Sequence, residues 1–111
     1  MGCAIHELRT YEAAPGKLAA LNARSRDHTL RLFERHGLQA VGFWTYAHGG
    51  WSDRLVYLMH FEDMADREAK WAAFGADPEW QQARADSEHD GPLTTRIRSD
   101  LLRPTDYSPQ Q

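Results

Sequence analysis

Ile5-His6-Glu7-Leu8-Arg9-Thr10-Tyr11 is the stretch that decides the fold of this 111-residue chain. Side chains of a β-strand point alternately to its two faces, so this alternation predicts a strand over residues 4–12. One face carries Ile5, Glu7, Arg9 and Tyr11, and the other carries His6, Leu8 and Thr10. Charged side chains on a covered strand need partners, because an unpaired buried charge is very costly.

Helical and extended patterns follow this strand in a regular order. Pro15-Gly16 is expected to end the strand, and a helix is expected to follow up to His36, where Gly37 suits the left-handed position after a helix. The remaining expected elements are strands over 38–46 and 55–61 joined by a hairpin over 48–53, a helix from Asp63 or Asp66 to Phe74 that Gly75 stops, a helix beginning at Asp77-Pro78, and a strand over 93–102. The order β-α-β-β-α-β predicts a ferredoxin-like α+β fold with the first strand central and antiparallel to the third.

Length and composition limit the classes of function. The chain is expected to form one domain over residues 1–111, with a Pro-rich C-terminal tail at 103–111. Its 13 basic and 16 acidic side chains give a net charge of -3 without a basic cluster, so no nucleic-acid partner is expected. The one cysteine, Cys3, excludes an intramolecular disulfide and a cysteine zinc site. No apolar run approaches the ~20 residues of a membrane span, and a cytoplasmic location is expected.

Glu7, Arg9 and Tyr11 are the first candidates for a site, because they project from one face of the central strand. In a structural interpretation, Glu7 and Arg9 neutralise each other or a neighbouring strand. In a functional interpretation, Arg9 binds a carboxylate or enolate oxygen and Tyr11 donates a hydrogen bond to it. The sequence leaves both open.

Histidines are the second group of candidates. His28 shares a three- and four-residue periodicity with Leu21, Ser25 and Leu32, so it is expected to face the sheet, as a structural residue or as an acid-base group. His60 and His6 are expected to lie close together on adjacent strands, and His60 is a second candidate for proton transfer. Two histidines without a third ligand are a poor metal signal, so no metal site is expected.

Aromatic residues could build a core or line a pocket. Trp44, Tyr57 and Trp71 are the candidates for substrate binding among them, although core packing is their most common use. The sheet face without helices is expected to carry Val41, Phe43, Met59 and Ile97. Such a face needs a cover, which predicts a homodimer.

Several phrases along the chain resemble the NIPSNAP family in order and spacing. They are Ile5–Tyr11, Arg35-His-Gly37, Gly42-Phe-Trp44, Phe74-Gly-Ala-Asp-Pro-Glu-Trp80 and Leu102-Arg-Pro-Thr-Asp-Tyr-Ser-Pro109. The resemblance implies a ferredoxin-like subunit that forms a dimeric α+β barrel, with ligands between sheet and helices or in the barrel lumen. By analogy with similar barrels, it implies a small enzyme or ligand-binding domain that needs no cofactor and holds a small, aromatic or acidic, organic molecule. The alternative is a non-catalytic protein-interaction module, since proteins for which the family is known act in mitochondrial and vesicle-related binding.

Overall fold

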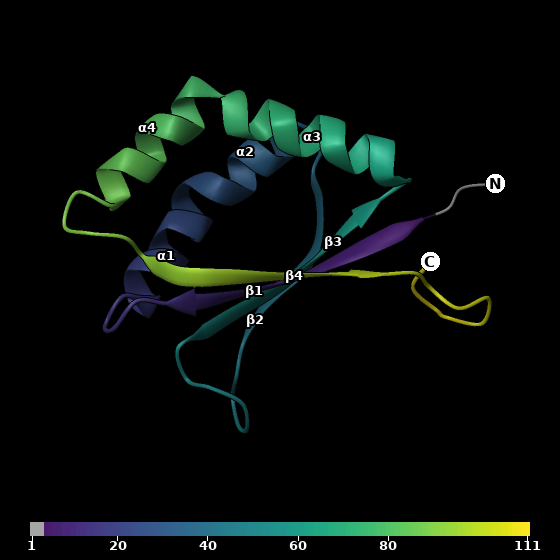
Figure 1. Ribbon diagram of the computed structural model, residues 1–111, viewed down its shortest axis with the longest axis horizontal. Coiled ribbons are helices and arrows are strands. Elements are labelled where there is room, and N and C mark those ends of the chain that lie inside the picture. Colours follow the sequence, from purple (N-terminus) through teal and green to yellow (C-terminus); the bar gives the residue numbers. More distant parts are fainter. Residues whose placement is uncertain (1–3) are drawn as a thin grey trace.

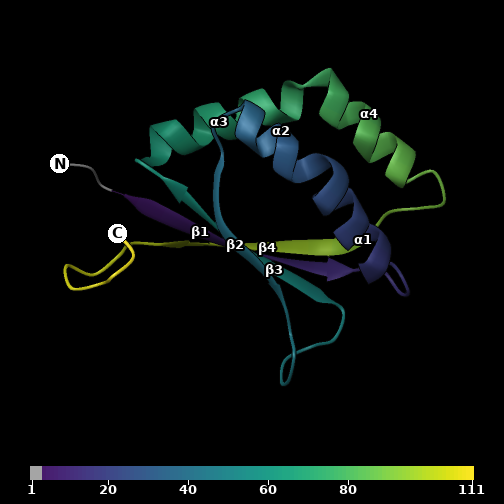
Figure 2. The same cartoon turned by 180° about the vertical axis from the view of Figure 1, so that it is seen from behind.

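The computed structural model describes residues 4–111 and contains one antiparallel sheet with helices on one of its faces (Figure 1, and from behind in Figure 2). The elements are β1 (Ile5–Ala13), α1 (Leu18–Arg24), a π-helical turn (Ser25–Thr29), α2 (Leu30–Arg35), β2 (Gln39–Thr45), β3 (Arg54–Phe61), α3 (Met64–Ala76), α4 (Pro78–Ser87) and β4 (Thr94–Leu102). Cys3 lies outside the described residues.

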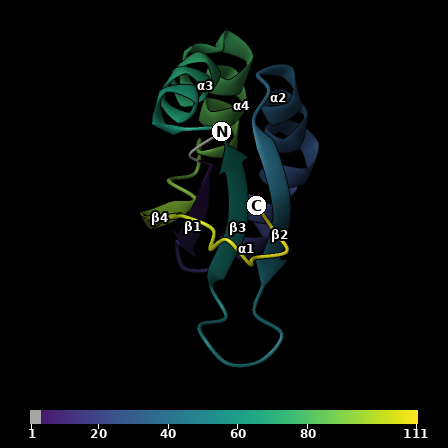
Figure 3. The same cartoon turned by 90° about the vertical axis from the view of Figure 1, so that its right-hand side faces the viewer.

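The strand order is β2-β3-β1-β4, and β1 is antiparallel to both of its neighbours. His6 pairs with His60 of β3 and with Leu102 of β4, which fixes the register of the central strand. Figure 3 looks along the sheet and shows α2, α3 and α4 above it. The predicted ferredoxin-like α+β fold is therefore confirmed.

Helix boundaries follow local chemistry. The Asp63 carboxylate caps α3 by accepting from the Asp66 backbone N–H at 2.8 Å, and Asp77 caps α4 by accepting from Glu79 at 2.8 Å. The expected stop at Gly75 is wrong, because α3 continues to Ala76. The break occurs at Asp77, whose ψ of 118° is extended, since Pro78 disfavours a helical residue before it.

The core lies between the sheet and the helices. Alternate residues of β3 are buried there: Leu55, Tyr57, Met59 and Phe61. The first helical segment, which comprises α1, the π-helical turn and α2, packs against them with Leu21, Leu32 and Phe33. Phe74 from α3 packs there as well. This packing holds the helix-facing side of β1, with Glu7, Arg9 and Tyr11, under a cover of helices.

Three of the four residues expected on the side of the sheet without helices face the other way. Met59 is fully buried, and Phe43 packs against the core. Ile97 pairs with Tyr11 and so lies on the helix-facing side. Each alternating set of β3 contains apolar side chains, Leu55 and Met59 in one and Val56 and Leu58 in the other, so apolar residues alone do not tell one face from the other.

A register shift in β2 between Ala40 and Gly42 explains why Phe43 faces the core. The extra residue at the shift puts Ala40 and Phe43 on the same face, opposite Met59 and Tyr57. The register places Leu8, Trp44, Val56 and Leu58 on the open face. No helix among residues 4–111 is long and apolar enough to cross a membrane.

Candidate functional site

A cavity of about 270 Å³ lies between the sheet and the helices. Its polar lining includes Arg9 and Tyr11 from β1, Tyr57 from β3, and Arg24, Ser25 and Thr29 from the first helical segment. Its apolar lining includes Phe33, Phe43, Trp71, Phe74 and Trp80. A pocket with mostly aromatic walls and a few converging polar groups is typical of a small-molecule site.

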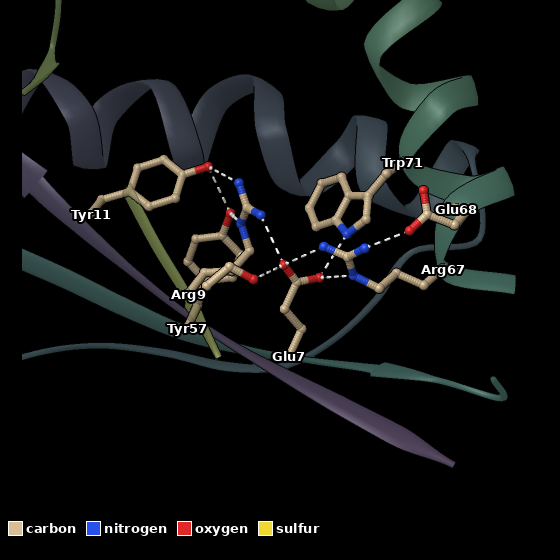
Figure 4. A network of polar contacts seen from close by, with 8 residues as sticks. Glu7, Arg9, Tyr11, Tyr57, Arg67, Glu68 and Trp71 are labelled. Atoms are coloured by element: carbon tan, nitrogen blue, oxygen red, sulfur yellow. Dashed lines mark hydrogen bonds and ion pairs between the residues drawn. The ribbon is translucent and has the colours of Figure 1, made fainter. Parts of the chain in front are cut away.

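Arg9 organises the floor of this cavity (Figure 4). Its Nε donates to the Tyr57 hydroxyl at 2.8 Å, and one Nη donates to the Tyr11 hydroxyl at 3.1 Å. The other Nη donates to Glu7 at 2.9 Å. A guanidinium has five N–H donors, so two donors of Arg9 have no partner among residues 4–111.

The two phenol groups leave one further donor. Their oxygens lie 2.8 Å apart, and each also accepts from Arg9. Tyr57 donates its hydroxyl proton to Tyr11, so the Tyr11 proton has no acceptor in the part of the chain described. Two N–H groups of Arg9 and the hydroxyl of Tyr11 thus remain as free donors beside the cavity, which suits an anionic or carbonyl oxygen.

Glu7 is hydrogen-bonded to Arg9 and to three further side chains around it. Its fully buried carboxylate accepts from Arg9, from Nε and Nη2 of Arg67 at 3.0 and 3.2 Å, from the Trp71 indole at 2.8 Å, and from the Ser99 hydroxyl at 2.5 Å. Burial raises the pKa of Glu7, but these hydrogen bonds outweigh it and lower the pKa to about 2. Glu7 is therefore ionised at neutral pH and holds Arg9 in place.

The surroundings also keep Arg9 and Tyr57 protonated. Burial lowers the pKa of Arg9, but Tyr57, Tyr11 and Glu7 raise it more, so the guanidinium stays charged. Burial and then Tyr11 raise the pKa of Tyr57 well above its usual value. The Tyr57 phenol therefore stays protonated and donates to the Tyr11 hydroxyl.

Arg9 also contacts the aromatic wall. Its guanidinium carbon lies 4.6 Å from the ring centre of Trp71, whose N–H is bound to Glu7. Glu7 and Arg9 pair directly, as the structural interpretation expected, and Arg9 at the same time lines the cavity. The two interpretations of this strand are thus compatible.

His28 does not line the cavity, contrary to the expected orientation toward the sheet. Its Nδ1 lies 3.5 Å from Arg31 on the exposed side, while Thr29 takes the buried position. The cause is the π-helical turn, in which the Leu30 N–H bonds to the Ser25 carbonyl and one additional residue enters the turn. Regular helical spacing cannot predict that shift.

Arg24, like Thr29 and Phe33, lines this site without having been predicted from the sequence. It is buried, lines the cavity, and lies 5.2 Å from the ring centre of Trp80. An arginine three residues after Leu21 on the apolar stripe was a signal that could have indicated it.

Comparison with known proteins agrees with this architecture. The NIPSNAP family model matches residues 6–109, nearly the whole chain. The chain belongs to the NIPSNAP family. Protein NipSnap homolog 3B of Mus musculus is 29% identical over 77 residues, which are 69% of this chain and 30% of that protein. The chain thus spans less than a third of the length of that relative.

Two solved NIPSNAP structures are similar over almost their full lengths. An uncharacterized NIPSNAP-like domain protein from Burkholderia xenovorans is 25% identical, with a TM-score of 0.85 over 98% of this chain and 91% of that one. A NIPSNAP family protein with unknown function from Agrobacterium tumefaciens is 23% identical, with a TM-score of 0.84 over 97% and 94%. These likenesses establish the fold of the NIPSNAP domain.

The other predicted site residues of this NIPSNAP domain lie away from the cavity. His60 and His6 do come together, with ring centres 4.9 Å apart and Nδ1 to Nε2 at 3.3 Å, but on the open face of the sheet. Burial, and then His60, lower the pKa of His6. Trp44 is 53% exposed on that same face. Of the predicted residues, the fold therefore gathers Glu7, Arg9, Tyr11, Tyr57 and Trp71 at one place, and leaves out His28, His60 and Trp44.

Proposed function

We propose that this NIPSNAP domain binds a small organic acid with a flat apolar body in the cavity between sheet and helices. The observation that carries the proposal is the set of free donors of Arg9 and Tyr11, held by Tyr57, on a floor enclosed by aromatic rings. In this proposal the carboxylate or a carbonyl oxygen of the ligand accepts from Arg9 and a phenol, and the ring packs against Phe33 and Trp71.

The chemistry of the floor favours binding and polarisation of a ligand oxygen over proton transfer. A general acid works best when its pKa lies near the working pH, whereas the pKa of Tyr57 is raised. A phenol that stays protonated beside a charged guanidinium is suited to stabilise negative charge on a bound oxygen. If the domain is an enzyme, we expect it to stabilise an enolate or similar anion in this way.

A pair of shape-matched compounds tests the proposal. We expect 4-methylbenzoate to bind the wild-type protein more tightly than neutral 4-methylbenzamide in isothermal titration calorimetry. Arg9→Lys is expected to weaken binding of the acid roughly 10-fold or more, because an ammonium group cannot form two parallel hydrogen bonds. His28→Gln, outside the cavity, serves as the control and is expected to leave the affinity unchanged.

A different result would favour the protein-interaction alternative. If a panel of aromatic acids binds folded wild type and folded Arg9→Lys equally, or does not bind, then Glu7 and Arg9 form a structural ion pair. Circular dichroism at the assay temperature shows whether each variant is folded.

We also propose that a second copy of the chain covers the open face of the sheet and forms a homodimer in the cytoplasm. Leu8, Val56 and Leu58 form an apolar strip there, and Trp44 is 53% exposed beside it. Light scattering is expected to give twice the 12.7 kDa mass of one chain, and Leu58→Asp to reduce it. A 12.7 kDa wild-type particle at micromolar concentration would reject the dimer.

A further inference from the structure

Arg24 provides a second guanidinium at the cavity, away from the Arg9 cluster. It ends α1, and its side chain is only 6% exposed. It reaches the C-terminal end of α4, where one Nη donates to Ser87 Oγ at 3.3 Å and to Glu88 at 3.2 Å.

One edge of this guanidinium has no protein partner. Both side-chain hydrogen bonds of Arg24 use Nη1, and the buried Nε has no hydrogen-bond partner among residues 4–111. Nearly all buried polar groups in proteins are paired, so an unpaired buried N–H requires an explanation. The edge formed by Nε and Nη2 is a fork that can bind a carboxylate with two parallel hydrogen bonds.

The charges at this end of the cavity are not balanced. Glu88 pairs with Arg24 and lies 3.7 Å from Arg84, which also lines the cavity. One carboxylate thus faces two guanidinium groups in this cluster. The remaining positive charge favours an anion beside Arg24.

The two guanidinium groups lie at different parts of one aromatic wall. Arg9 contacts Trp71 at 4.6 Å from its ring centre, and Arg24 contacts Trp80 at 5.2 Å. Phe74 lies between the two indoles, with its ring centre 5.8 Å from that of Trp71 and 4.7 Å from that of Trp80. A flat molecule lying along this wall would have a cation at each end.

We infer that Arg24 binds a second acidic group of the ligand, so that the cavity accepts a small, flat dicarboxylic acid. This inference rests on the proposed function, since it uses Arg9 as the other anchor. A cavity of about 150 Å³ accepts benzene, so 270 Å³ has room for one ring with two carboxylates. Aromatic packing holds the body of the ligand, and the fork of Arg24 selects for the second charge.

The experiment compares terephthalate with 4-methylbenzoate, which differ in one carboxylate on the same ring. Wild type is expected to bind terephthalate at least 10-fold more tightly by calorimetry at fixed ionic strength. In Arg24→Gln this preference is expected to disappear while 4-methylbenzoate binds as before. Arg26→Gln removes the same charge from an exposed position of the same helical segment, and is expected to keep the preference.

Each result decides the matter. Equal affinities for the two acids in wild type, or a preference that survives in Arg24→Gln, would overturn the role of Arg24 while the Arg9 site stands. Loss of both acids in Arg24→Gln would also overturn it, because the residue would then act on the pocket as a whole. If neither acid binds wild type, the proposed function fails together with this inference.

Discussion

Glu7→Gln should remove the support of the Arg9 cluster without changing the size of the side chain. The carboxylate is fully buried and accepts hydrogen bonds from Arg9, Arg67, Trp71 and Ser99, all of which act as donors. An amide has less negative charge and places an NH₂ group against these donors. The pKa of the Glu7 carboxyl is about 2 in the folded protein, compared with an ordinary value of 4.5, and this difference corresponds to about 3 kcal/mol of stability at neutral pH. This agrees with the cost of about 3–5 kcal/mol for breaking a buried ion pair.

The pH dependence of this loss has a definite sign. Folding lowers the pKa of Glu7, so its contribution is complete above the unfolded value of 4.5 and is lost as the pH falls toward about 2. The difference between wild type and Glu7→Gln should therefore be about 3 kcal/mol at pH 7 and about 2 kcal/mol smaller at pH 3.

Urea titrations at both pH values measure this difference. Glu68→Gln is the matched control, because Glu68 pairs with the same Arg67 at 2.8 Å but its side chain is 67% exposed. An exposed pair contributes about 0–1 kcal/mol, so this variant should stay near wild type. A loss below about 1 kcal/mol in Glu7→Gln, or the same loss at pH 7 and pH 3, would refute the reasoning.

Two further predictions concern stability, both measured by urea titration. Gly37→Ala should destabilise the protein by about 1 kcal/mol, because the φ of +71° is unfavourable for a residue with a Cβ. Gly75→Ala in α3 should be neutral or stabilising, because alanine favours a helix and the added Cβ meets no atom within 4 Å. Destabilisation by Gly75→Ala that equals that by Gly37→Ala would contradict the backbone argument. Trp80→Ala should cost about 2 kcal/mol, less than the about 3–5 kcal/mol of a fully buried tryptophan, because Trp80 is half-buried at the cavity against Phe74. A loss of the full amount would show that its ring supports the core rather than the cavity wall.

The sequence by itself determined the order of elements and which side chains of β1 share a face. Alternation in β1 was enough to place Glu7, Arg9 and Tyr11 together, because the period of a strand does not depend on what packs against it. Local capping chemistry likewise predicted helix starts at Asp63 or Asp66 and at Asp77, since a carboxylate accepts from a backbone N–H two or three residues away, and the structure selects Asp63 and Asp77.

Only the tertiary structure decided which other residues join that face. Met59 lies in the core and Leu58 on the open face because pairing with β1 sets the register, whereas both alternating sets of β3 contain apolar side chains. The π-helical turn moves His28 outward and Thr29 inward, because one additional residue changes the direction of every side chain within that turn. Arg24 became part of the site through α4, since contacts between segments more than 60 residues apart depend on how helices pack and not on local spacing.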